Sequence, residues 1–321
     1  MKGNSACHFF LLCYNEAGDR KMKKMLFIMN PNAGKRKGRR HLADIIDLYN
    51  RAGYEVTVYM TAAHGHATEI ARERAGGMDV VVCCGGDGTF NETVSGLLEG
   101  GHRIPVGYIP AGSTNDFASG LKLPMDVMEA ARLVLEGKPR IYDIGEFGRQ
   151  HFAYTASFGM FTKTSYATPQ SLKNKLGYLA YLLESVQELS QIKKEYIRID
   201  LPEGEVIEGE FIFGAVCNAR KVGGVLHLDP RLVDLCDGKF ELLLVRYPHK
   251  LGEIKECIRA LRKQDYTSEM LIFRSFADLT FTARPDLSWS LDGEQGQGQE
   301  QLKISCLPGA IELILGEESH V

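Results

Sequence analysis

The stretch Asp79–Thr89, which reads DVVVCCGGDGT, decides the fold of this chain. Its first part is a continuous apolar run, as expected for a β-strand that is buried on both faces of a parallel sheet. The glycines that follow, Gly85, Gly86 and Gly88, let the backbone turn tightly and approach a polyanion. Asn91–Glu99 then has the character of a helix, so the stretch predicts a strand, a glycine turn and a helix in direct succession.

The segments on either side repeat this alternation of strand and helix. The predicted strands are Met25–Met29, Tyr54–Met60, Asp79–Cys84 and Val106–Pro110, and the predicted helices are His41–Arg51, Ala67–Ala75, Asn91–Glu99 and Val127–Glu136. Such alternation is typical of a parallel sheet covered by helices. We therefore predict an α/β nucleotide-binding domain over residues 23–138.

After Pro139 the pattern changes to strands that follow one another directly. These predicted strands are Ile141–Phe147, His151–Phe158, Tyr196–Leu201, Glu205–Asn218, Lys239–Arg246, Asp278–Ala283, Leu287–Leu291, Gln301–Cys306 and Ile311–Leu315. They indicate an antiparallel β-sandwich domain over residues 139–321, with the last residues as candidates for a return to the first domain. Helices are predicted at Leu172–Lys193 and Leu251–Arg262, and a mobile loop at Gly293–Gln299.

The composition is that of an ordinary globular protein, with 321 residues, 44% apolar residues and 25% charged residues. A net charge of -3 gives no reason to expect nucleic acid as a partner. The eight cysteines lack paired zinc-ligand spacing, so free thiols in a reducing cytoplasm are the simplest interpretation. No apolar run approaches the roughly 20 residues that span a membrane. Residues 1–22 precede the first strand and are predicted to be a poorly packed extension.

Three polar loops follow predicted strands. In the glycine turn, Asp87 places a carboxylate where it could hold Mg²⁺ or orient a hydroxyl, beside a helix N-terminus suited to phosphate. The loop Asn30–Lys35, NPNAGK, lacks the Gly-Lys-Ser/Thr ending of a P-loop and could also be a plain turn. The loop Pro110–Phe117, PAGSTNDF, suits contact with a nucleotide or a simple helix cap. Ligands bind at the carboxyl ends of strands in such sheets, so we expect the three loops to converge on one crevice.

The order and spacing of these loops resemble the diacylglycerol kinase catalytic-domain family, which includes bacterial diacylglycerol kinases, related bacterial lipid kinases and sphingosine kinases. The resemblance rests on Gly85–Thr89 with Asn91-Glu92, on Asn30–Gly34 and on Gly112–Phe117, and it covers about residues 23–316. It implies a nucleotide domain of α/β type and a C-terminal β-sandwich, with the active site between them.

The resemblance also implies which residues bind the nucleotide. The implied set is Asn30, Pro31, Asn32, Ala33, Gly34, Thr61, Gly85, Gly86, Asp87, Gly88, Thr89, Phe90, Asn91 and Thr114. In the second domain, the segment Leu291–Glu294 resembles the family's Asp-Gly-Glu motif. The matching glutamate is the proposed proton acceptor, so Glu294 and Asp87 are the two carboxylates expected to carry catalysis.

A magnesium site is implied by a second loop. The segment DLCDGKF resembles a family loop that binds a structural magnesium, and the matching positions are Asp234, Asp237 and Lys239, the last through its backbone carbonyl. The preceding segment, Arg231–Asp237, is slightly longer than the family pattern. The pair Asp237-Gly238 also has the composition of a plain turn, as does Asp292-Gly293.

The function that the resemblance implies is transfer of the γ-phosphate of ATP, with Mg²⁺, to the hydroxyl of a lipid, with diacylglycerol as the leading acceptor and phosphatidic acid as the product. An NAD kinase, which shares the Gly-Gly-Asp-Gly loop, is one alternative, and a non-catalytic lipid- or nucleotide-binding protein is another. A lipid substrate leads us to expect a cytoplasmic protein in peripheral contact with the inner face of the membrane. The basic run Lys35–Arg40 and the helix Leu172–Lys193 are candidates for that contact. A solvated helix start explains the basic run at least as well, and packing on the sandwich explains the helix better. The oligomeric state is open, with a homodimer as one option.

Overall fold

The computed structural model describes residues 22–159, 192–219, 221–222, 226–227 and 233–317. The predicted N-terminal extension, apart from Met22, and the predicted helix Leu172–Lys193, apart from its last two residues, lie outside the described residues. The described cysteines are free thiols, and no helix in the described part of the chain is long and apolar enough to cross a membrane.

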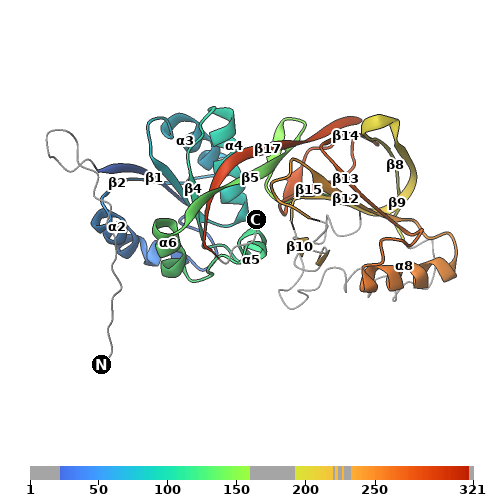
Figure 1. Cartoon of the computed structure of the whole chain (residues 1–321), viewed down its shortest axis with the longest axis horizontal. Helices are drawn as coiled ribbons and strands as arrows, with labels where there is room; N and C mark the ends of the chain where they lie inside the picture. Colours follow the sequence, from blue (N-terminus) through green and yellow to red (C-terminus); the bar gives the residue numbers. More distant parts are fainter. Residues whose placement is uncertain (1–21, 160–191, 220, 223–225, 228–232, 318–321) are drawn as a thin grey trace, which may run out of the picture.

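The N-terminal half forms a parallel sheet with helices on both faces (Figure 1), as its alternating pattern predicted. The strands run in the order β4-β3-β1-β2, so β3, the apolar run of the opening stretch, lies in the interior of the sheet. The elements are β1 (Lys23–Met29), α1 (Lys37–Arg40), α2 (Leu42–Arg51), β2 (Tyr54–Met60), α3 (His66–Arg74), β3 (Val80–Gly85), α4 (Asp87–Glu99), β4 (Val106–Pro110), α5 (Asp116–Gly120) and α6 (Val127–Glu136).

Side chains alternate across β3 and divide the core of this half into two layers. Val81 and Cys83 pack with α3 and α4 on one face of the sheet. Val80, Val82 and Cys84 pack with α2 and α6 on the other face. This double burial explains why the strand is apolar at successive positions rather than at every second one.

The C-terminal half consists mainly of antiparallel strands. The elements are β5 (Lys138–Phe147), β6 (Gln150–Phe152), β7 (Thr155–Gly159), β8 (Glu195–Asp200), η2 (Pro202–Gly204), β9 (Val206–Cys217), β10 (Lys221–Val222), β11 (Leu226–His227), β12 (Phe240–Arg246), α8 (Leu251–Lys263), β13 (Leu271–Phe276), β14 (Asp278–Thr282), β15 (Trp289–Leu291), β16 (Glu294–Gly296) and β17 (Gln301–Leu315). Strands β7, β8, β9, β12, β14 and β15 all contribute to one apolar core, as expected for a sandwich. Phe158, Phe281 and Trp289 form edge-to-face ring contacts at its centre.

The last strand, β17, belongs to both halves of the molecule. It pairs with β14 and β5 in antiparallel fashion and then, at Leu313, with Val106 of β4 in parallel fashion. Figure 1 shows it, in red, running from one half into the other. Two separate strands, Gln301–Cys306 and Ile311–Leu315, were predicted here, with Pro308-Gly309 between them. In the structure these residues belong to a single strand, at an irregularity where the register with β5 shifts between Leu307 and Ile311.

Several other elements differ from the prediction. One that bears on function is α4. It begins at Asp87 and not at Asn91, because Gly86 is extended and serves as the N-cap. Asp87-Gly88-Thr89 therefore forms the first helical turn, where an acidic side chain is favoured by the helix dipole. In the predicted mobile loop, Glu294–Gly296 pairs with β15 as strand β16. Strand β13 was not predicted.

Candidate active site

The three polar loops converge, as their positions in the sheet predicted. Gly86 and Gly112 pack so closely that a β-carbon on Gly112 would lie 2.6 Å from the α-carbon of Gly86. A β-carbon on Gly34, which has φ +51°, would lie 2.6 Å from the carbonyl oxygen of Ala111. The amide of Asn30 donates to the hydroxyl of Thr89 at 3.2 Å. Side chains larger than hydrogen at these glycines would force the loops apart, so glycine is required by packing here.

Asp87 turns its carboxylate toward the third loop. Its Oδ2 accepts from the backbone N–H of Asp116 at 2.9 Å, and its Oδ1 accepts from the N–H of Phe117 at 3.3 Å. The hydroxyl of Tyr108 lies 3.5 Å from Oδ1. Burial raises the pKa of Asp87 to about 7, although the two N–H donors oppose that rise. The carboxylate therefore joins the glycine turn to the start of α5.

The other predicted nucleotide residues differ in how they are placed. Thr61 follows β2 and donates its N–H to the carbonyl of Met29, beside the first loop. Thr114 is exposed at the third loop. Phe90 is fully buried, with its ring 4.6 Å from that of Phe117 and 4.7 Å from that of Tyr108, so its side chain faces the core. Ala33 is also largely buried.

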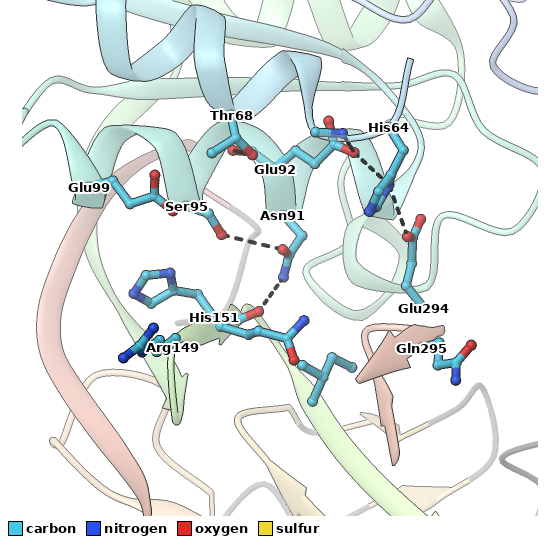
Figure 2. A pocket seen from close by; sticks show the side chains of 14 residues that line it. His64, Thr68, Asn91, Glu92, Ser95, Glu99, Arg149, His151, Glu294 and Gln295 are labelled. Atoms are coloured by element: carbon cyan, nitrogen blue, oxygen red, sulfur yellow. Dashed lines mark hydrogen bonds and ion pairs between the residues drawn. The ribbon is translucent and has the colours of Figure 1, made fainter. Parts of the chain in front are cut away.

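A pocket of about 190 Å³ lies between α4 and the strands β6, β15 and β16. Polar side chains from both halves of the chain line it, as Figure 2 shows for ten of them: His64, Thr68, Asn91, Glu92, Ser95, Glu99, Arg149, His151, Glu294 and Gln295. A polar lining of this kind suits a hydroxylated or charged group better than an acyl chain.

Glu294 reaches this pocket from the C-terminal half and lies directly against the glycine turn. Its carboxylate occupies the space where a β-carbon on Gly88 would be, so a larger residue at position 88 would require this carboxylate to move. Gly88 belongs to the first turn of α4 and follows Asp87 in the sequence. The two predicted carboxylates thus flank one helical turn, Asp87 facing α5 and Glu294 facing the pocket.

Asp292 fixes the hairpin that carries Glu294. Its buried carboxylate accepts from the N–H groups of Ala153, Tyr154 and Thr155 at 2.6, 3.0 and 3.0 Å. It also accepts from the side-chain amide of Asn91 on α4 at 2.8 Å. Burial raises the pKa of this carboxyl and the four donors oppose that rise; one of the donors comes from the other half of the molecule. Asp292 has φ +51°, so it combines this anchoring role with the tight hairpin turn.

Glu92, which follows Asn91, holds the loop between β2 and α3. It accepts from the N–H of Gly65 at 2.8 Å and from that of Ala67 at 3.2 Å. His64 of this loop points its Nδ1 toward both Glu92 and Glu294. The Asn91-Glu92 pair therefore connects the glycine turn with two other segments of the site.

The predicted magnesium loop gains only limited support. Asp234 and Asp237 are exposed, and each accepts from the N–H two residues further on, at Cys236 and Lys239. Glu241 next to them has a buried Oε2 without a hydrogen-bond partner, and burial, together with the charges of Asp237 and Asp234, raises its pKa to about 8. Such oxygens suit a hard cation. Yet no three His, Cys, Asp or Glu side chains in the described residues are grouped to hold a metal, so this site stays a prediction.

His64, Arg149 and His151 are pocket residues that sequence reasoning did not select. His151 lines the pocket, its carbonyl accepts from Asn91 at 2.9 Å, and burial lowers the pKa of its ring. His64 belongs to a polar loop at the carboxyl end of a parallel strand, the kind of position at which ligands bind. The position of His64 after a predicted strand was therefore a signal in the sequence for a site residue. Arg149 and His151 lie in a β-hairpin, and no comparable signal in the sequence pointed to them.

Comparison with known proteins adds an independent result. Residues 24–147 match the model of the diacylglycerol kinase catalytic domain. The chain is 34% identical to a diacylglycerol kinase of Bacillus subtilis over 277 residues, covering 86% of this chain and 91% of that protein. It is 33% identical to a diacylglycerol kinase of Staphylococcus saprophyticus, covering 85% of this chain and 90% of that protein.

The fold is also similar to solved structures. A crystal structure of a protein from Bacillus anthracis str. Sterne, assigned as a diacylglycerol kinase, superposes with a TM-score of 0.78. The match covers 96% of this chain and 100% of that one, at 23% sequence identity. This likeness shows that the two chains share one fold.

Proposed function

The chain belongs to the diacylglycerol kinase catalytic-domain family, and on that premise we propose that it transfers the γ-phosphate of ATP to the hydroxyl of a lipid, with diacylglycerol as the leading acceptor. Family membership supports a lipid kinase. The choice of ATP as donor, of diacylglycerol as acceptor and of phosphatidic acid as product is our proposal.

The observation that carries the proposal is the position of Glu294. Its carboxylate comes from the C-terminal hairpin and lies against Gly88, in the turn expected to meet the phosphates. Phosphoryl transfer to a hydroxyl is assisted by a side chain, such as a carboxylate, that accepts the hydroxyl proton beside the transferred group. The polar pocket next to Glu294 gives the acceptor hydroxyl an approach to the same point.

The proposed step is a direct transfer of the γ-phosphoryl group from ATP to the lipid hydroxyl. The lipid hydroxyl oxygen forms a bond to the γ-phosphorus as the bond to the leaving diphosphate oxygen breaks, and Glu294 takes the hydroxyl proton. The free N–H groups at the start of α4 would stabilise charge on the phosphate oxygens. The packed glycines of the three loops allow the backbone to come close to those oxygens.

Magnesium, when bound, would neutralise charge on the phosphates. Asp87 fits a role beside it, because a buried carboxyl with a pKa of about 7 becomes more readily ionised next to a cation. Asp234 and Asp237, with the carbonyl of Lys239, would hold a second, structural ion.

We also propose that the protein works in peripheral contact with the cytoplasmic face of a membrane. The lipid acceptor resides in the bilayer while ATP is dissolved in the cytoplasm, so the site must reach both. The basic run Lys35–Arg40, which is mostly exposed, is one candidate for this contact.

The test is a transfer assay with labelled ATP and a panel of acceptors: diacylglycerol, monoacylglycerol, a sphingoid base and a long-chain alcohol in mixed micelles, and NAD in solution. We expect label in phosphatidic acid, and we expect Glu294→Gln and Asp87→Asn each to lower turnover by about 10²–10⁴-fold in folded protein. Label in NAD alone would identify an NAD kinase. Nucleotide binding without transfer to any acceptor would identify a binding protein.

A further inference from the structure

His64 stands between two carboxylates from different parts of the chain. Its Nδ1 lies 3.0 Å from Oε1 of Glu92 and 3.6 Å from Oε2 of Glu294 (Figure 2). A carboxylate oxygen only accepts hydrogen bonds, so both contacts are favourable when Nδ1 carries the hydrogen. Both are close contacts between the imidazole and a carboxylate, the shorter one with Glu92 and the longer one with Glu294.

The loop that presents His64 is well fixed. Glu92 accepts from the N–H groups of Gly65 and Ala67, on the C-terminal side of His64. On the other side, Thr61 donates its N–H to Met29, and the ring of His66 accepts from the N–H of Ala62. The backbone that carries the imidazole is therefore fixed on both sides, although the His64 side chain is 81% exposed.

Glu294, by contrast, has few constraints of its own. It follows a two-residue hairpin turn, its side chain is 51% exposed, and several rotatable bonds separate its carboxylate from the backbone. Within the described residues, His64 is the one hydrogen-bonding or charged partner recorded for this carboxylate. Its other close neighbour is Gly88, which limits the space but donates no hydrogen bond to it.

We propose that His64 is a positioning residue for Glu294, oriented in turn by Glu92. The series Glu92, His64, Glu294 follows the general logic in which a base is directed by a second group that a third group orients. It rests on the proposed function, in which Glu294 accepts the proton of the lipid hydroxyl. Its consequence is that His64 affects the transfer step and leaves the binding of ATP unchanged.

A purely structural role for His64 makes a different prediction. An exposed ion pair contributes little to stability, so its loss would leave both kcat and KM nearly as they were. Misplacement of a catalytic group by about 1 Å can lower the rate by up to about 10²-fold without loss of binding. The division of the effect between kcat and KM therefore separates the two roles.

The test uses three substitutions in the full chain with ATP and diacylglycerol micelles. His64→Ala removes the imidazole and with it both carboxylate contacts, and we expect kcat to fall about tenfold with KM for ATP unchanged. His64→Gln supplies a neutral hydrogen-bond donor, so we expect a smaller fall in kcat. His64→Arg supplies a cationic donor, and we expect it to retain most of the wild-type kcat. In a Glu294→Gln background, His64→Ala should have no further effect, because the residue acts through Glu294.

His249→Gln is the matched control, because it removes another exposed histidine–carboxylate contact, 3.8 Å from Glu210 in the β-rich half. We expect wild-type kcat for this variant, and thermal melting checks that all variants are folded. Unchanged kcat in His64→Ala, or an equal loss in the Glu294→Gln background, would overturn the positioning role while leaving the kinase intact. Absence of wild-type lipid phosphorylation would overturn the proposed function and this inference with it.

Discussion

Asp87 belongs to the candidate active site, and its buried carboxyl group also makes the stability of the folded protein depend on pH. The carboxyl group is buried, and its pKa rises to about 7 from an ordinary value near 4. Because the folded state holds the proton more tightly than the unfolded state, stability from this group is complete below about pH 4. It is lost as the pH rises through 7. Across that interval the loss amounts to about 4 kcal/mol at most.

We therefore predict that, in nucleotide-free protein, the stability of Asp87→Asn relative to wild type increases from pH 4 to pH 8. Urea unfolding at the two pH values measures this difference. Asp126→Asn is the control, because backbone N–H groups lower the pKa of the Asp126 carboxyl and its contribution is lost in acid instead. An Asp87→Asn variant whose advantage shrank as the pH rose would contradict the prediction.

At the scale of elements, α4 and the β15–β16 hairpin are joined by one hydrogen bond between Asn91 and Asp292. We predict that Asn91→Ala lowers the free energy of unfolding by about 1–3 kcal/mol, as for other hydrogen bonds to charged groups. Asn91→Asp should lower it further, because it sets two carboxylates against each other in a buried site. Chemical denaturation measures both changes.

Ser95→Ala provides the comparison for these variants. Its hydroxyl lies on the same helix, 3.5 Å from the Asn91 amide oxygen, and makes only a weak contact. We expect a change below about 0.5 kcal/mol for this substitution. Equal stability of the Asn91→Asp and Asn91→Ala variants would show that Asp292 does not sense the charge at position 91.

The elements also show where sequence reasoning was sufficient. Strand β3 was predicted because burial on both faces requires a continuous apolar run, and the convergence of the loops followed from their common position at strand ends. The start of α4 was not predicted, because Gly-Asp-Gly has the composition of a turn until tertiary packing makes it helical. The contact of His64 with Glu294 joins segments far apart in the sequence and leaves no local pattern.

At the scale of the whole molecule, β17 pairs with strands of both halves. Leu313 is fully buried where β17 pairs with β4, while Ile304 of the same strand lies in the core of the C-terminal half. We predict that Leu313→Ala lowers stability by about 2–5 kcal/mol and shifts the unfolding of both halves together.

Two probes in different halves can follow this unfolding. Trp289 is the single tryptophan and reports on the β-rich core, while labelling of the buried thiols of Cys83 and Cys84, read by mass spectrometry, reports on the parallel sheet. Ile141→Ala is the control, because Ile141 pairs with β17 but is 53% exposed. A shift of only one probe in Leu313→Ala would show that the halves unfold separately.

The late position of β17 in the sequence also delays the moment at which β4 can pair with it during synthesis. Val106 of β4 is translated about 200 residues before its partner Leu313, an interval of about 10 to 40 seconds at ordinary elongation rates. Throughout that time the nascent parallel sheet exposes the edge of β4, and an unpaired edge is a template for pairing with another chain. The growing polypeptide is thus most exposed to misassembly and chaperone capture before its final strand leaves the ribosome.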